Sequence, residues 1–70
     1  MQRSSQTTLT AFTVEVEFFS GDLPYGTETY RISAASWYQA EQEALARSCD
    51  SPYDDDRVPD RRRRANARAV

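Results

Sequence analysis

The sequence predicts an α+β fold: an antiparallel β-hairpin packed by one α-helix (a ββα unit), followed by a disordered, arginine-rich C-terminal tail. Three observations support this fold class. Two segments, 10–19 and 27–34, alternate apolar and polar residues with a period of two, which is typical of half-buried strands. A third segment, 36–48, repeats its apolar residues at helical spacing. Residues 50–70 are dense in charge and poor in apolar residues, which is typical of disorder.

The first expected strand carries the strongest local pattern of the chain. Its apolar residues alternate and therefore share one face: Phe12, Val14, Val16 and Phe18. Glu15 and Glu17 fall on the opposite face. Residues 20–26 contain two glycines and a proline, which predict a loop that joins the two strands as a hairpin. Tyr30 and Ile32 of the second strand are then expected on the buried face.

The helix is expected to begin at Ser36. Ser36 and Gln39 have the spacing of a capping box, in which each side chain satisfies a free backbone N–H of the first turn. The residues that follow are mostly good helix formers, and Pro52 ends the helix, because the residue before a proline avoids helical angles. One narrow stripe is predicted to face the sheet: Trp37, Ala40, Ala44, Leu45 and Ser48.

A chain of 70 residues holds one domain at most. We expect a disordered N-terminus (1–9), a ββα domain (10–49) and a disordered charged tail (50–70). Cys49 is the only cysteine and there is no histidine, so no internal disulfide, metal ion or cofactor is expected. Because an isolated hairpin is marginally stable in water, we predict a homodimer, formed by edge-strand pairing or by helix packing.

Charge is divided unevenly along the chain. Residues 1–56 hold three arginines and ten acidic residues, whereas residues 57–70 hold six arginines and one acidic residue. A flexible arginine-rich arm can bind phosphate oxygens along a nucleic-acid backbone. Six residues are the candidates for such binding: Arg57, Arg61, Arg62, Arg63, Arg64 and Arg68. The alternatives are a tail that only keeps the protein soluble and a tail that lies on the acidic body of the same molecule.

The hairpin offers a second candidate binding site. Phe19, Leu23 and Tyr25 are out of phase with the core face, so some of them are expected to be exposed as binding anchors; alternatively, they fold back over the end of the core. Three acidic residues would add contact charges: Glu15, Glu17 and Asp22. We therefore expect a protein-binding accessory factor that docks on a partner protein through the acidic hairpin and its loop, with nucleic-acid binding through the tail as the alternative.

The composition argues against catalysis and against a membrane location. Without His or Lys, the usual general bases and Schiff-base formers are missing, and a domain this small leaves no room for a ligand cleft. No segment approaches the roughly 18 apolar residues of a membrane span. The polar segment 1–10 also lacks the apolar stretch of a secretory signal. We expect a cytoplasmic protein that is not an enzyme.

The segment from Tyr30 to Ala44 resembles a pattern of small ββα accessory proteins of phages and mobile elements. In that pattern a strand ends in Val/Ile-x-Ala, and a serine then caps a helix with alanines at four-residue spacing. The segment is also similar to the opening of HicB-type antitoxins, although the further strand and the DNA-binding C-terminal domain of that family are not expected here. The resemblance implies a phage-encoded accessory protein.

Overall fold

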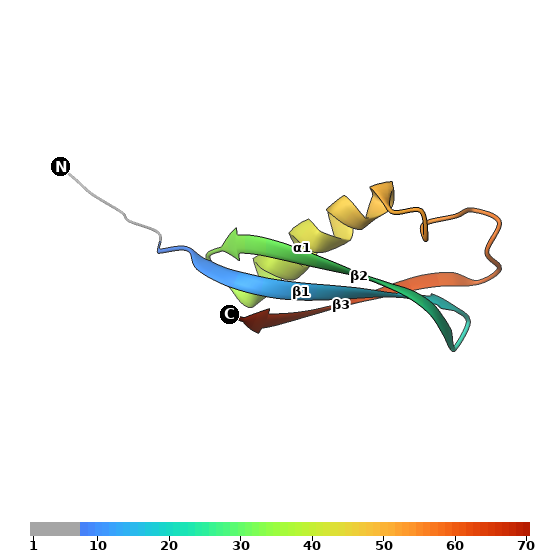
Figure 1. Ribbon diagram of the computed structural model, residues 1–70, viewed down its shortest axis with the longest axis horizontal. Coiled ribbons are helices and arrows are strands. Elements are labelled where there is room, and N and C mark those ends of the chain that lie inside the picture. The colour runs from blue at the N-terminus through green and yellow to red at the C-terminus, as the bar shows by residue number, and fades with distance from the viewer. Residues whose placement is uncertain (1–7) are drawn as a thin grey trace.

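The computed structural model describes residues 8–70, which form a three-stranded antiparallel sheet with one helix on one face (Figure 1). The α+β class predicted from the sequence is therefore confirmed. The strand order in the sheet is β2-β1-β3. The elements in chain order are β1 (Thr10–Ser20), β2 (Leu23–Ala34), α1 (Trp37–Arg47), the 3₁₀ turn η1 (Ser48–Asp50) and β3 (Arg61–Ala69).

The core lies between the sheet and α1. The four alternating apolar residues of β1 are all buried, as predicted: Phe12, Val14, Val16 and Phe18. Ile32 and Ala34 extend this buried face onto β2, and Ala40 and Ala44 of α1 pack on it. Alanine has a short side chain, so these two positions allow the helix to approach the sheet closely. The face away from α1, called the open face below, carries the other residues of β1, including Glu15 and Glu17.

The predicted disordered tail is wrong for residues 61–69, which form β3. β3 runs back along β1, so that Figure 1 shows it ending beside the start of β1. Its register places Ala65 opposite Val16 and Ala67 opposite Val14, and both alanines pack against the core. The order is thus ββαβ, with a third strand that the sequence-based prediction did not include. The strand forms because β1 has a second edge to pair and its open face carries carboxylates for the arginines.

The connection to β3 is tied to the β1–β2 turn. The backbone N–H of Gly21 donates to the carbonyl of Asp60 (2.9 Å), and the Ser20 hydroxyl donates to the carbonyl of Pro59 (2.7 Å). Gly21 has a φ of 60°, a left-handed conformation that glycine adopts without steric cost. Only Gly21 and Asp22 lie between β1 and β2, so the turn is tighter than the loop predicted over 20–26.

A bulge at the end of the hairpin turns Tyr25 toward the core. Phe18 pairs with Gly26 and Phe19 pairs with Pro24, so Tyr25 is the extra residue of β2. Its ring lies 6.2 Å from that of Phe18, and its hydroxyl donates to the carbonyl of Tyr53 (2.6 Å). Tyr25 therefore covers the end of the core, as one of the two interpretations of the sequence expected.

The start of α1 has the predicted cap. Ser36 Oγ accepts a hydrogen bond from the Gln39 N–H (3.2 Å), and Gln39 Oε1 accepts one from the Ala35 N–H (3.3 Å). The reciprocal bond thus reaches one residue further back than an ideal capping box. Trp37 departs from the predicted stripe, because 59% of its surface is exposed, and its ring packs edge-on against Tyr38.

Two further expectations concern disorder at the N-terminus and helices that could span a membrane. The predicted disorder of 1–9 falls largely on residues 1–7, which lie outside the described residues; Thr8 and Leu9 belong to no helix or strand. Within residues 8–70, no helix is long and apolar enough to cross a membrane.

Replacing Gly26 with alanine is expected to destabilise the protein by about 1–3 kcal/mol. A Cβ atom at Gly26 would lie 2.5 Å from Cδ1 and 2.7 Å from Cγ of Tyr53, whose ring also contacts Phe18 and Tyr25. The free energy of unfolding from chemical denaturation measures the effect. In a Tyr53→Ala background the clash is absent, so Gly26→Ala should then cost much less. An equal cost in both backgrounds would contradict this contact.

Candidate partner-binding site

A cavity of about 270 Å³ lies at the end of the sheet where β1 turns into β2 and where β3 begins, called the turn end below. It is open to solvent and takes its walls from two segments far apart in the sequence. Phe19, Gly21 and Asp22 come from the β1–β2 turn region. The other wall comes from β3: Arg62, Arg63 and Arg64. The turn end therefore joins residues of the two sites that the sequence predicts separately.

The antiparallel return of β3 brings the two sets together. Phe19 pairs with Arg62, and Glu17 pairs with Arg64. Since neighbouring residues of a strand point to opposite faces, Arg62 and Arg64 lie on the open face, whereas Arg61 and Arg63 lie on the α1 side. The arginine run is thus divided into two pairs with different surroundings.

The pair on the α1 side is held by the acidic segment that precedes β3. Arg61 Nε lies 3.2 Å from Asp54 Oδ1, and Arg63 lies 3.6 Å from Asp54 Oδ2 and donates to Ser48 Oγ (3.2 Å). The Asp54 side chain is 15% exposed. Its Oδ1 atom accepts no hydrogen bond among the described residues, because the nearby Arg61 N–H is not directed at it. Two guanidinium groups compensate this sheltered carboxylate, so Arg61 and Arg63 serve the fold.

Arg64 is anchored on the open face. It donates to Glu17 Oε1 (2.7 Å), and its guanidinium carbon lies 5.3 Å from the centroid of the Phe19 ring. Such a cation–π contact and an exposed ion pair each contribute about 1 kcal/mol or less. Arg64 thus holds Phe19 in place without being removed from solvent, and the Phe19 ring forms an apolar surface between arginines.

Arg62 is the least engaged arginine of the cavity. Its side chain is 62% exposed, and its partner is Asp60, two residues earlier, at 3.3 Å. An exposed ion pair of this kind contributes little and is easily exchanged for another carboxylate. Leu23, in the same turn region, is 69% exposed, and Asp22 is also exposed. The turn end therefore offers an available cation, an aromatic ring and an exposed aliphatic side chain.

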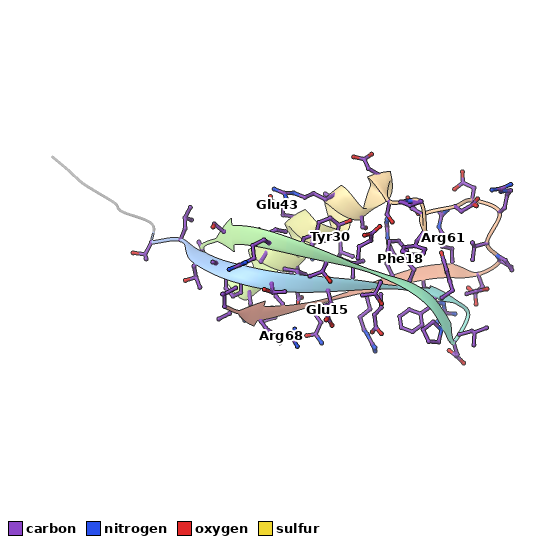
Figure 2. All side chains as sticks on the ribbon, in the orientation of Figure 1. Glu15, Phe18, Tyr30, Glu43, Arg61 and Arg68 are labelled. Atoms are coloured by element: carbon purple, nitrogen blue, oxygen red, sulfur yellow. The ribbon has the colours of Figure 1, made fainter. Side chains whose placement is uncertain are left out.

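The remaining candidate residues lie elsewhere. Glu15 pairs with Arg68 (3.8 Å) midway along the open face, where Figure 2 shows both side chains on the side of the sheet away from α1. Together with the Glu17–Arg64 pair, this contact places basic residues of β3 on the acidic face of the hairpin. One of the alternatives from the sequence was such a basic segment lying on the acidic body of the same molecule. Arg57 lies in the connection to β3 and pairs with Asp55.

The pairing with Arg57 stabilises the charged form of Asp55. Arg57 donates to Asp55 from its side chain (Nε to Oδ1, 3.1 Å) and from its backbone N–H (3.0 Å). These hydrogen bonds lower the pKa of Asp55 from 3.8 to about 2. Because the pKa of Asp55 is lower in the folded state, its pairing with Arg57 stabilises the fold. This stabilisation is fully present above pH 3.8, the unfolded pKa, and is lost as the pH falls through about 2.

An NMR titration of the Asp55 side-chain carbonyl carbon should therefore show a midpoint near 2. In Arg57→Gln the guanidinium is removed, and the midpoint should move up toward 3.8. A midpoint near 3.8 in the unsubstituted protein would show that the two side chains do not interact in solution.

Sequence reasoning missed three residues that build the site. Asp54 and Ser48 hold the two arginines on the α1 side, Arg61 and Arg63. Gly21 lines the cavity, and its backbone N–H donates to the connection that leads to β3. One signal could have found the strand that unites them. From residue 61 onward the odd positions end in three alanines, which alternate with Asn66 and Arg68. This is a period of two, hidden by the unbroken arginine run before it.

Comparison with known proteins identifies no relative. No protein-family model matches the chain, and neither the curated proteins nor the solved structures give a significant match. Within the described part of the chain, no three His, Cys, Asp or Glu side chains are grouped to hold a metal ion.

Proposed function

We propose that this protein is a small accessory factor that docks on a partner protein through the turn end of its hairpin. One observation carries the proposal: Phe19, Asp22 and Arg62 line one open cavity, beside the exposed Leu23. Arginine and aromatic residues are enriched among the residues that dominate binding energy at protein interfaces. A sheet end that already presents both residue types side by side is suited to this role.

The charge of the site indicates the chemistry of the partner. Arg62 exchanges its exposed bond to Asp60 for a carboxylate of the partner, in the planar two-point geometry that a guanidinium favours. Phe19 and Leu23 then contact an apolar side chain close to that carboxylate. The partner segment is thus a short acidic and apolar one, whereas the original expectation placed acidic residues of this chain in the contact. Glu15 and Glu17 contribute less, because Arg68 and Arg64 already pair with them.

The alternative, nucleic-acid binding, receives less support from the same geometry. Each of the six candidate arginines has a carboxylate within 4.0 Å: Arg57, Arg61, Arg62, Arg63, Arg64 and Arg68. A phosphate backbone would have to compete with these carboxylates. Arg64 lies over the Phe19 ring, the aromatic ring next to the arginines, so a base could stack on that face only by displacing this contact.

Affinity capture from a lysate of the organism that encodes the chain tests the proposal when it is run with matched variants. Leu23→Ala and Arg62→Ala change the turn end. Leu9→Ala is the control, because Leu9 is a similarly exposed leucine at the opposite end of the sheet. The expected result is a protein that the unsubstituted chain and Leu9→Ala retain equally and that both turn-end variants lose. Calorimetry with the purified protein then measures the affinity.

Nuclease treatment distinguishes the two functions. Capture that survives nuclease and depends on Leu23 supports protein binding. Capture that disappears with nuclease, together with binding of a labelled oligonucleotide that Arg62→Ala weakens and added salt abolishes, would transfer the function to nucleic acid. Equal capture by all three variants would exclude the turn end as the docking site.

A further inference from the structure

The two edges of the sheet differ in how far other parts of the chain cover them. At the β3 edge, Glu41 of α1 accepts a hydrogen bond from the backbone N–H of Ala67 (3.0 Å), so that a helix side chain caps the strand. β2 forms the other edge and is 12 residues long. Natural proteins usually blunt a long edge strand with charged side chains, proline or a bulge, because its free backbone groups pair readily with another strand. From Thr27 to Ala34, β2 has no proline and no bulge, and its two charged residues, Glu28 and Arg31, are of opposite sign.

The register identifies which backbone groups of β2 point outward. The Val70 N–H donates to the Ala11 carbonyl (3.0 Å), so the odd-numbered residues of β1 bond to β3. In an antiparallel sheet hydrogen-bonded pairs alternate, so the even-numbered residues of β1 bond to β2. The β2 residues between these bonded positions therefore direct their N–H and C=O groups to the outer edge: Thr27, Thr29, Arg31 and Ser33.

These outward residues lie in an environment that favours strand addition. All four are exposed, and no hydrogen bond to their backbone groups is made by residues 8–70 outside β2. Tyr30 lies between them on the α1 side, where it is partly buried and packs on the rim of the core. A strand added at this edge would satisfy the backbone groups and cover the exposed part of Tyr30.

We infer that the β2 edge pairs with the β2 edge of a second copy of this chain, about a two-fold axis, to form a continuous six-stranded sheet. Charge restricts the register of such a pair. Residues directly opposite each other must face the same side, and the two-fold registers centred on Glu28 or on Arg31 place like charges opposite each other. Registers centred on Thr29 or on Tyr30 avoid this.

The register centred on Tyr30 uses the edge most fully. It pairs Thr29 with Arg31 of the second copy and Thr27 with its Ser33, so that all four outward residues of each chain are bonded. The two Tyr30 rings then meet across the axis, an aromatic cross-strand pair on the α1 side. The turn end is not part of this contact, so the dimer and the proposed docking site are independent of each other.

Sedimentation of the full chain from micromolar to millimolar concentration tests the inference. The expected result is a reversible monomer–dimer equilibrium. Thr29→Pro removes one outward N–H and leaves the bonds to β1 intact, since a proline is tolerated where an edge N–H faces solvent. It should sediment as a monomer with an unchanged far-ultraviolet circular dichroism spectrum. Thr29→Val keeps the N–H and the strand propensity and should still dimerise.

Amide hydrogen exchange by NMR gives a readout that needs no variant. The amides of the four outward residues should be protected at high protein concentration and should exchange freely at low concentration, while Tyr30 and Ile32 are protected at both. A monomer throughout the concentration range would overturn the inference. So would a dimer in which these four amides exchange freely, because the contact would then lie elsewhere, for example at Trp37 and Tyr38.

Discussion

A chain that lacks residues 61–70 is expected to lose cooperative folding. β3 covers one whole edge of β1, and Ala65 and Ala67 shield part of the buried face. Without it, α1 packs on a two-stranded hairpin, which is marginal in water. A chain of this size has a free energy of unfolding of roughly 4–10 kcal/mol in total. The loss of an entire strand, with its hydrogen bonds and its share of apolar burial, is expected to cost more than this total free energy of unfolding. Thermal unfolding followed by circular dichroism measures the effect.

The matched control for this deletion keeps the strand and removes its open-face charge. Replacing Arg62, Arg64 and Arg68 with threonine retains the backbone pairing and raises the strand propensity of the segment. This variant should unfold cooperatively, because it loses only exposed ion pairs and the contact of Arg64 with the Phe19 ring, each worth about 1 kcal/mol or less. If the deletion unfolds with the same midpoint as the full chain, the segment contributes nothing to the sheet. In that case the sequence-based expectation of a disordered tail would be restored.

Replacing Phe18 with alanine is expected to cost about 3–5 kcal/mol, the usual range for a fully buried aromatic residue. The Phe18 side chain is fully buried. Its ring contacts those of Tyr25 and Tyr53, which lie 6.2 and 5.6 Å away between centroids. These tyrosines come from β2 and from the connection to β3, so Phe18 holds together the three segments that build the turn end. Urea denaturation gives the change in the free energy of unfolding.

The adjacent Phe19 provides the control, because it has the same chemistry on the opposite face. Phe19 is partly exposed and contacts Arg64, so Phe19→Ala should cost about 1 kcal/mol or less. The two variants should also differ in function, since Phe19→Ala is expected to weaken docking in a protein that remains folded. Equal destabilisation by the two variants would mean that the side chains do not alternate between the buried and open faces here.

The hairpin and the helix could be predicted because local patterns determine them. The alternation of Phe12 to Phe18 requires a strand with one buried face, and Ser36 with Gln39 marks the start of a helix. Each of these patterns involves residues that are only a few positions apart in the sequence. The end of the hairpin was less predictable, because Tyr25, the bulge residue, contacts the ring and the backbone carbonyl of Tyr53, which comes from a distant segment.

β3 could not be predicted from its own composition. Its five arginines, three alanines and one asparagine give it a low intrinsic preference for a strand. The conformation of this segment is determined by its surroundings: β1 supplies an edge, Glu15 and Glu17 supply carboxylates, and the core packs against Ala65 and Ala67. Tertiary context of this kind overrides local propensity. The same reason explains why the candidate site was predicted as two separate surfaces, one at Leu23 and one at the arginines.

The most direct test of this account is an NMR measurement of cross-strand contacts between β1 and β3 in the full chain. The structure predicts nuclear Overhauser effects between Glu15 and Asn66 and between Glu17 and Arg64, together with slow exchange of the amides that bond the two strands. Such contacts would establish that the arginine segment is part of the sheet and that it brings Arg62 beside Phe19. Random-coil chemical shifts and fast amide exchange throughout 61–69 would contradict both the fold and the site that depends on it.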